Sequence, residues 1–142
     1  MKSTPTLATL LLAVIATASG PASSAWAEVC ATVEVDNVRP QQGLLMVAAF
    51  GSAETFGKTP MAQLRLPAGE AKMKFELCGL SGTEVALTLF QDLDSDGKMG
   101  RNLLGMHTEP WGGSGTPGTF GPSWETGRVA LNGKPIAVRL SQ

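Results

Sequence analysis

The sequence has little of what most enzyme and nucleic-acid sites are built from. It has one histidine, two cysteines and no tyrosine among 142 residues, and aromatic residues make up 6%. The single histidine, His107, excludes a metal site built from several imidazoles, and the absence of a C-x-x-C pair excludes a dithiol redox site. Eleven basic residues against twelve acidic ones give a net charge of -1. This balance excludes the dense basic face that binds a phosphate backbone, so we expect no nucleic-acid partner.

The one long apolar run lies at the N-terminus. Lys2 is the only charged residue before Glu28, Leu7–Ala18 is almost entirely apolar, and small residues lead to Ala25-Trp26-Ala27. A positive start, an apolar stretch of about a dozen residues and an A-x-A site are typical of a secretory signal peptide. We therefore predict a signal peptide over residues 1–27, cleaved after Ala27.

Two other uses of this N-terminal segment fit the sequence less well. A transmembrane anchor needs about 20 apolar residues, and Gly20-Pro21 interrupts the run. A lipoprotein would have small residues before its cysteine, whereas Cys30 follows Ala27-Glu28-Val29. No later segment is long and apolar enough to span a bilayer, so we expect no membrane span after removal of the signal. The product is predicted to be exported, to the periplasm or the outside of the cell, as a single domain over residues 28–142.

Short segments with the period of two typical of strands follow one another through this domain. The main ones are Glu28–Val35, Leu44–Phe50, Ala71–Leu77 and Glu84–Phe90. A short strand at Gln63–Leu66 and two closing strands at Arg128–Leu131 and Ile136–Leu140 bring the number to about seven. Asn132-Gly133 predicts a hairpin between the last two. Because no segment has the period of a useful helix, the pattern indicates an all-β fold, an antiparallel sandwich of two sheets.

The two cysteines occupy outward positions of two predicted strands. Cys78 continues the polar series Lys72, Lys74 and Glu76, and Cys30 lies on the polar side of Glu28–Val35. Disulfides persist in the oxidising compartments to which exported proteins travel. We predict a Cys30–Cys78 disulfide as a structural staple, the alternative being two unpaired exposed thiols.

The run Asp92–Gly97 (DLDSDG) has the spacing that opens a calcium loop, D-x-[DN]-x-[DN]-G. Carboxylates on alternate residues converge on one hard cation if the chain curls, and glycine permits the sharp turn. The predicted ligands are Asp92, Asp94, Asp96, the backbone carbonyl of Lys98, and Asn102 and Glu109.

The loop departs from an EF-hand beyond this point. Gly100 brings no side chain to the ninth position, and Leu103 stands where a bidentate glutamate belongs. A strand precedes the loop instead of a helix. The expected calcium affinity is therefore weak, on the order of 10⁻⁴–10⁻³ M. The alternative is a solvated turn without an ion, because Asp, Ser and Gly favour turns by themselves.

The stretch from about Phe90 to Leu131 resembles the bacterial DUF2141 family of small exported proteins. Three parts carry the resemblance, an acidic one, a middle one and a final one: Asp92, Asp94, Asp96, Gly97 and Lys98; Gly105, Glu109 and Gly112; Phe120-Gly121-Pro122. The sequence departs from the family pattern at Gly100, where an aspartate is expected, at Gln91, where a histidine is common, and at His107-Thr108, which replaces Pro-Lys. The resemblance implies export and a β-sandwich of immunoglobulin or transthyretin-like type, and it implies no particular reaction.

A hydrolase of the cell envelope is the alternative, with Glu109, His107, and Ser114 or Glu125 as its candidate groups. The segment around Ser114 lacks the last glycine of a G-x-S-x-G nucleophile elbow, because Thr116 stands there. Glu109 and Glu125 are the pair that a glycosidase would use.

Trp111 and Trp124 lie in the glycine-rich region and are candidate ligand-binding residues, because an indole face suits a sugar ring or another flat apolar ligand. The alternative is that each packs over the end of the core. We expect an exported, non-enzymatic module whose acidic loop is ordered by calcium and faces a protein partner or an envelope polymer. A structural subunit that assembles through edge strands is a further alternative.

Overall fold

The computed structural model describes residue 20, residues 28–118 and residues 121–141. Within these residues the strands are β1 (Val29–Asp36), β2 (Leu44–Phe50), β3 (Ala62–Pro67), β4 (Lys72–Leu80), β5 (Glu84–Asp92), β6 (Trp111–Gly113), β7 (Arg128–Ala130) and β8 (Ile136–Arg139), and the one helix, α1 (Trp124–Gly127), is a single turn. The predicted signal peptide falls outside the described residues except for residue 20. Among the residues that are described, no helix is long and apolar enough to span a bilayer.

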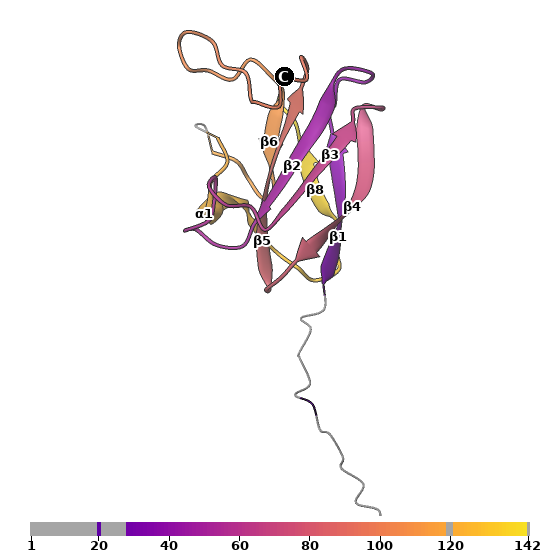
Figure 1. Ribbon diagram of the computed structural model, residues 1–142, viewed down its shortest axis with the longest axis vertical. Coiled ribbons are helices and arrows are strands. Elements are labelled where there is room, and N and C mark those ends of the chain that lie inside the picture. Colours follow the sequence, from indigo (N-terminus) through magenta and orange to yellow (C-terminus); the bar gives the residue numbers. More distant parts are fainter. Residues whose placement is uncertain (1–19, 21–27, 119–120, 142) are drawn as a thin grey trace, which may run out of the picture.

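The strands form two sheets that face each other (Figure 1). One sheet has the order β4-β1-β8, and the other the order β3-β2-β5-β6, with β7 also paired to β5. The residues at alternate positions meet between the sheets, where Val33, Leu45, Leu77, Leu87 and Val138 are almost fully buried. The predicted all-β, two-sheet sandwich is thereby confirmed, and its strand pattern follows from the burial of one face per strand.

One strand pair differs from the antiparallel prediction. Strand β8 lies parallel to β1, with Val33 opposite Ile136 and Val35 opposite Val138. Every other named pair is antiparallel. The parallel pair arises because the chain crosses from one sheet to the other just before β8.

The hairpin predicted at Asn132-Gly133 is wrong for the same reason. Strand β7 pairs with β5, and β8 pairs with β1 in the opposite sheet, so the turn between them joins two layers. The Asn132 side chain accepts the N–H of Lys134 at 3.1 Å, which closes the turn locally. The turn residues were identified correctly, but the strands on either side take partners far away in the sequence.

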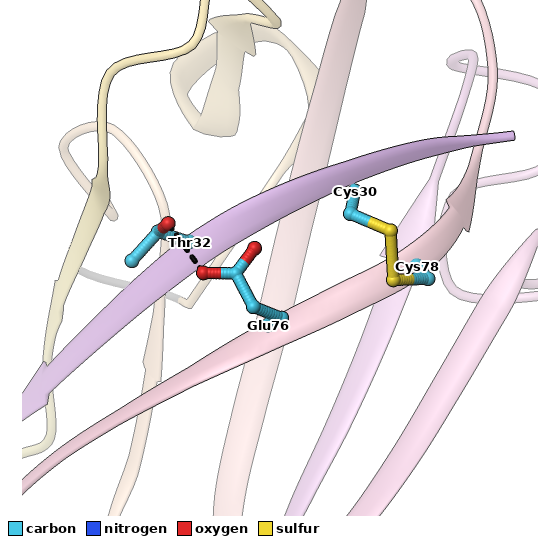
Figure 2. The surroundings of a disulfide bond; sticks show 4 residues. All are labelled: Cys30, Thr32, Glu76 and Cys78. Atoms are coloured by element: carbon cyan, nitrogen blue, oxygen red, sulfur yellow. Dashed lines mark hydrogen bonds between the residues drawn. A yellow bond between two sulfur atoms is a disulfide. The ribbon is translucent and has the colours of Figure 1, made fainter.

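The outer face of β1 and β4 carries a ladder of polar cross-strand pairs next to a disulfide. Cys30 and Cys78, predicted to pair, are joined by a disulfide with their Cα atoms 4.0 Å apart. Figure 2 shows Thr32 and Glu76 hydrogen-bonded beside it on the same two strands. Farther along, Lys74 pairs with Glu34 at 3.1 Å and Lys72 with Asp36 at 3.5 Å. All these groups face solvent, so the disulfide joins two strands from outside the core.

The connection between β1 and β2 is fastened to the end of β5 by one buried glutamine. Gln91 has no exposed surface, and its side-chain amide donates to the carbonyls of Arg39 and Gln42, each at 2.6 Å. Its side-chain oxygen accepts the N–H of Arg39 at 2.8 Å. Gln91 therefore holds the β1–β2 connection beside the place where the acidic loop begins.

Candidate functional site

The acidic loop starts where β5 ends. Asp92 is the last residue of β5 and is 1% exposed, whereas Asp94 and Asp96 are exposed. Each of these three residues places a carboxylate oxygen within 4.8 Å of the oxygens of the other two. The strand thus fixes one carboxylate at the base of the loop, and the loop brings the other two above it.

The loop owes its curl to hydrogen bonds between these carboxylates and its own backbone. Asp92 accepts the N–H groups of Asp96 and Gly97, at 3.1 and 2.8 Å. Asp94 accepts the N–H of Asp96 at 3.2 Å, and Asp96 accepts that of Lys98 at 2.8 Å. Ser95 and Gly97 take the left-handed backbone conformation, with φ of 60° and 78°, which lets the chain reverse within five residues. The carboxylates are therefore gathered by a turn that backbone hydrogen bonds hold in place.

The charges in this turn repel one another. The N–H of Asp96 bonded to Asp94 lowers the pKa of that carboxyl, but four opposing effects outweigh it. These are desolvation, the hydrogen bond shared with Asp92, and the negative charges of Asp96 and Glu109. The net result is a raised pKa for Asp94. A bound cation would relieve this repulsion, and protonation relieves it as well.

Glu109, a predicted ligand, supports the loop backbone. Its carboxylate accepts the N–H of Leu93 with one oxygen and that of Gly100 with the other, each at 2.7 Å. The residue is 8% exposed. Both oxygens are thus engaged across the loop, and each retains only its second lone pair for other contacts.

Asn102, the other predicted side-chain ligand beyond the acidic run, organises a second turn. Its side-chain oxygen accepts the N–H groups of Leu104 and Met106, at 2.9 and 3.0 Å. Lys98, whose carbonyl was predicted to bind the ion, follows Gly97 directly and donates its N–H to Asp96. The structure therefore brings together three of the predicted ligand carboxylates and gives Asn102 and Glu109 backbone partners.

The groups of the predicted hydrolase do not converge. Ser114 has no exposed surface, accepts the N–H of Leu87 at 2.8 Å and donates to the carbonyl of Gly127. Leu87 and Leu93, which contact Ser114 and Glu109 respectively, are six residues apart along an extended chain, a separation of about 20 Å. The Ser114 hydroxyl is a buried bridge between β5 and the end of α1, far from the Glu109 carboxylate.

The remaining candidates lie on separate elements. His107 contacts Trp111, with ring centroids 5.4 Å apart, and its Nδ1 atom is buried without a hydrogen-bond partner. Burial, and then the positive charge of Arg101, lower the pKa of His107. Trp124 begins α1, and the exposed Glu125 follows it. Trp111 lies opposite Phe90 near the end of β5, whereas α1 runs into β7, which pairs with the start of β5.

The comparison with protein families places the chain in one family. Residues 33–139 match the family described as "Uncharacterized protein conserved in bacteria (DUF2141)". The chain belongs to the DUF2141 family. Neither a curated protein nor a solved structure matches the chain. The family match covers all eight strands in whole or in part, and it contains both the acidic loop and Glu109.

Gly100 of this DUF2141 protein lies against Thr108 and Glu109. A Cβ atom at Gly100 would lie 2.5 Å from Oγ1 of Thr108 and 3.4 Å from Oε2 of Glu109. The N–H of Gly100 donates to Glu109, and its carbonyl accepts the N–H of Thr108 at 3.0 Å. A side chain at position 100 would therefore displace the Thr108 side chain or loosen this contact.

Two features of the site were missed by the sequence analysis. Gln91 was noted only as a departure from the family pattern, although its buried amide fixes the β1–β2 connection. The second feature is a group of exposed apolar side chains at Leu103, Leu104 and Met106. Their signal in the sequence was a Leu-Leu pair between Asn102 and Gly105, in a region otherwise rich in polar residues and glycine.

Proposed function

We propose that this DUF2141 protein is an exported, non-enzymatic binding module whose loop Asp92–Gly97 binds calcium. The observation that supports calcium is the gathering of the Asp92, Asp94 and Asp96 carboxylates, whose ligand oxygens lie within 4.8 Å of one another. Calcium takes six to eight oxygen ligands and tolerates irregular geometry. Carboxylates, carbonyls and water are the ligands that it prefers.

In this proposal the three aspartates have different tasks. Asp92 is held by hydrogen bonds from two backbone N–H groups, and its carboxylate lies at the base of the site. Asp94 and Asp96 are exposed and move toward an ion by side-chain rotation. The carbonyl of Lys98 and water complete the shell, and Glu109 acts mainly by holding Leu93 and Gly100 in place. With so few side-chain ligands, we expect a dissociation constant on the order of 10⁻⁴–10⁻³ M.

Export rests on two observations. The first 27 residues have the pattern of a cleavable signal, and the Cys30–Cys78 disulfide is compatible with an oxidising compartment. Calcium at the concentrations found outside cells would occupy a site of the affinity expected here. The proposed partner of the loop is a protein or an envelope polymer.

Thermal unfolding with calcium and with chelator tests the ion site. At a hundredfold excess over the dissociation constant, calcium stabilises the folded protein by about 2.7 kcal/mol, which raises the melting temperature by several degrees. The increase is lost in Asp94→Ala, which removes this ligand oxygen. Glu70→Gln, which removes one exposed negative charge from the loop between β3 and β4, keeps it. No increase at about 10 mM calcium, well above the expected constant, would leave Asp92–Gly97 as a turn only.

Sedimentation with isolated cell-envelope material tests the partner. Binding that needs calcium and is lost in Asp94→Ala supports recognition through the loop. Equal binding by the Asp94→Ala variant would place any partner elsewhere on the molecule.

A further inference from the structure

Beyond the acidic loop, residues 101–107 form a projection that we call the finger. The segment between β5 and β6, which contains it, extends past the end of the sheets (Figure 1, orange, upper left). Leu103 is 106% exposed, Leu104 81% and Met106 57%, relative to the same residues in an extended reference chain. The largest apolar patch on a protein surface is often a functional one.

The finger is a closed turn that holds these side chains outward. Arg101 and His107 form an antiparallel bridge at its base, and Asn102 donates its N–H to the carbonyl of Met106 at 3.0 Å. Gly105 donates to the carbonyl of Asn102 at 2.9 Å, and the Asn102 side chain accepts the N–H groups of Leu104 and Met106. The N–H groups of residues 104–106 thus find partners inside the turn, which lowers the cost of bringing them to a lipid surface.

The size and shape of the patch favour lipid over a protein partner. Three such side chains offer roughly 300 Å² of apolar surface, judged from the energy of burying one of them. A stable protein–protein interface buries about 800 Å² on each partner. A small projecting tip also needs a matching pocket on a protein, whereas the acyl-chain boundary of a bilayer adapts to it.

The charges around the finger do not favour its contact with a lipid surface. Lys98 and Arg101 are exposed near the finger, but Asp94 and Asp96 in the neighbouring loop are exposed as well. Anionic lipid therefore attracts one pair and repels the other. The driving force is therefore the burial of the apolar side chains at the tip. This burial is equally favourable on a zwitterionic lipid surface.

We propose that the finger attaches the protein to a lipid bilayer by inserting Leu103, Leu104 and Met106 at the boundary between headgroups and acyl chains. The attachment is peripheral and reversible, because three side chains give no more than marginal membrane affinity. It does not depend on calcium, and it stands whether or not the acidic loop binds an ion.

A tryptophan placed at the tip tests insertion directly. The protein is expressed from its full chain, and its mass is measured first, because a retained N-terminal leader would bind lipid by itself. Leu103→Trp is compared with Lys134→Trp, which lies in the turn before β8, beside the start of β5 and at the opposite end of the sandwich. With phosphatidylcholine vesicles we expect a blue shift in emission and quenching by brominated acyl chains for Leu103→Trp only. Equal responses of the two variants, or none, would overturn the proposal.

Serine variants test which residues are responsible. Leu103→Ser and Leu104→Ser should each weaken partition into phosphatidylcholine vesicles about tenfold, the effect of losing about 1.4 kcal/mol of apolar burial. Val29→Ser removes the remaining exposed large apolar side chain of the described residues, at the far end of β1, and should change nothing. The melting temperatures of the three variants should match that of the unaltered protein.

Vesicle binding that persists in the double variant Leu103→Ser/Leu104→Ser contradicts the proposal. Self-association lost in that variant, without vesicle binding, would contradict it too, by making the tip a contact between copies.

Discussion

Glu109 accepts the backbone N–H of Gly100 at 2.7 Å, and a Cβ atom at position 100 would press on the Thr108 hydroxyl beside this bond. The other carboxylate oxygen of Glu109 holds the N–H of Leu93 at the same distance. One buried carboxylate therefore ties the start of the acidic loop to its end. Glu109 thus anchors the loop on the sandwich independently of the exposed Asp94 and Asp96.

Replacing Glu109 by alanine should destabilise the protein by about 2–4 kcal/mol. The substitution removes two charge-assisted hydrogen bonds and leaves two N–H groups without their partner. Glu109→Gln should lose less, because one oxygen acceptor remains. Urea unfolding measures the change, with the exposed Glu125→Gln as a control expected within about 0.5 kcal/mol of the unaltered protein. A loss seen only in the presence of calcium would contradict a backbone role and make Glu109 a ligand.

Gln91→Glu should destabilise the fold by about 3 kcal/mol or more. The Gln91 amide donates to the carbonyls of Arg39 and Gln42, and an ionised carboxylate at this buried position would face both of them without a proton to donate. The free energy of unfolding in urea at neutral pH measures the loss. The matched control is Gln63→Glu on β3, where the side chain is exposed and the same change should matter little. Equal small effects of the two variants would show that the Gln91 contacts do not hold the β1–β2 connection.

The double variant Cys30→Ser/Cys78→Ser should unfold with about 4 kcal/mol less free energy, because the disulfide closes a loop between residues 48 apart. Both cysteines are exposed, so the serines create no cavity. Denaturant unfolding with and without a reducing agent measures the difference. The reduced natural protein should match the double variant, which is itself insensitive to the reductant. A natural protein whose stability reduction leaves unchanged would assign the disulfide no stabilising role.

The sequence predicts the strands well and their partners less well. Val33, Val35 and Leu89 alternate with polar or half-buried neighbours because each strand buries one face, and a period of two records this directly. The pairing of β8 with β1 has no local signal. Asn132-Gly133 specifies a turn, but whether the strands on either side share a sheet depends on contacts with β5 and β1, distant in the sequence.

For the site, too, the sequence identifies the residue types, whereas the contacts of several of them depend on the fold. Asp92, Asp94 and Asp96 were identified by their spacing, because local curling alone brings them together. Glu109 and Asn102 have the right oxygen atoms for a ligand, but backbone N–H groups occupy them, and only the folded chain decides this. The exposure of Leu103 likewise depends on the turn that Asn102 closes.

His107→Phe should remove an acid-sensitive part of the stability. Burial and the charge of Arg101 lower the pKa of His107, so the folded state favours the neutral ring. The associated stability is present above the ordinary pKa of about 6.5 and is lost as pH falls through the lower folded value. Melting temperatures between about pH 7 and pH 5 should fall less steeply for the variant, which retains an aromatic ring against Trp111. Parallel curves for the two proteins would show that His107 does not contribute to acid sensitivity.

Asp94→Asn should change the melting temperature in opposite directions with chelator and with calcium. The N–H of Asp96 lowers the pKa of Asp94, but the opposing effects outweigh it, and the pKa is raised in the folded state. The folded state therefore binds the Asp94 proton more tightly than the unfolded state does. The stability that this proton gives is present at low pH and is lost as pH rises through the pKa of the folded state. At neutral pH with chelator, the variant is expected to melt above the unaltered protein, because the amide oxygen still accepts the N–H of Asp96 and the charge is gone. With calcium the order reverses, since a charged carboxylate binds the ion more tightly than the neutral amide oxygen that replaces it. The difference with chelator should vanish below about pH 4, where the carboxyl is protonated.

The control Glu70→Gln should show neither the reversal in calcium nor the convergence at low pH. A variant less stable than the unaltered protein in chelator would mean that the carboxylate's hydrogen bond outweighs the repulsion. An unreversed order in calcium would mean that the charge of Asp94 does not contribute to ion binding.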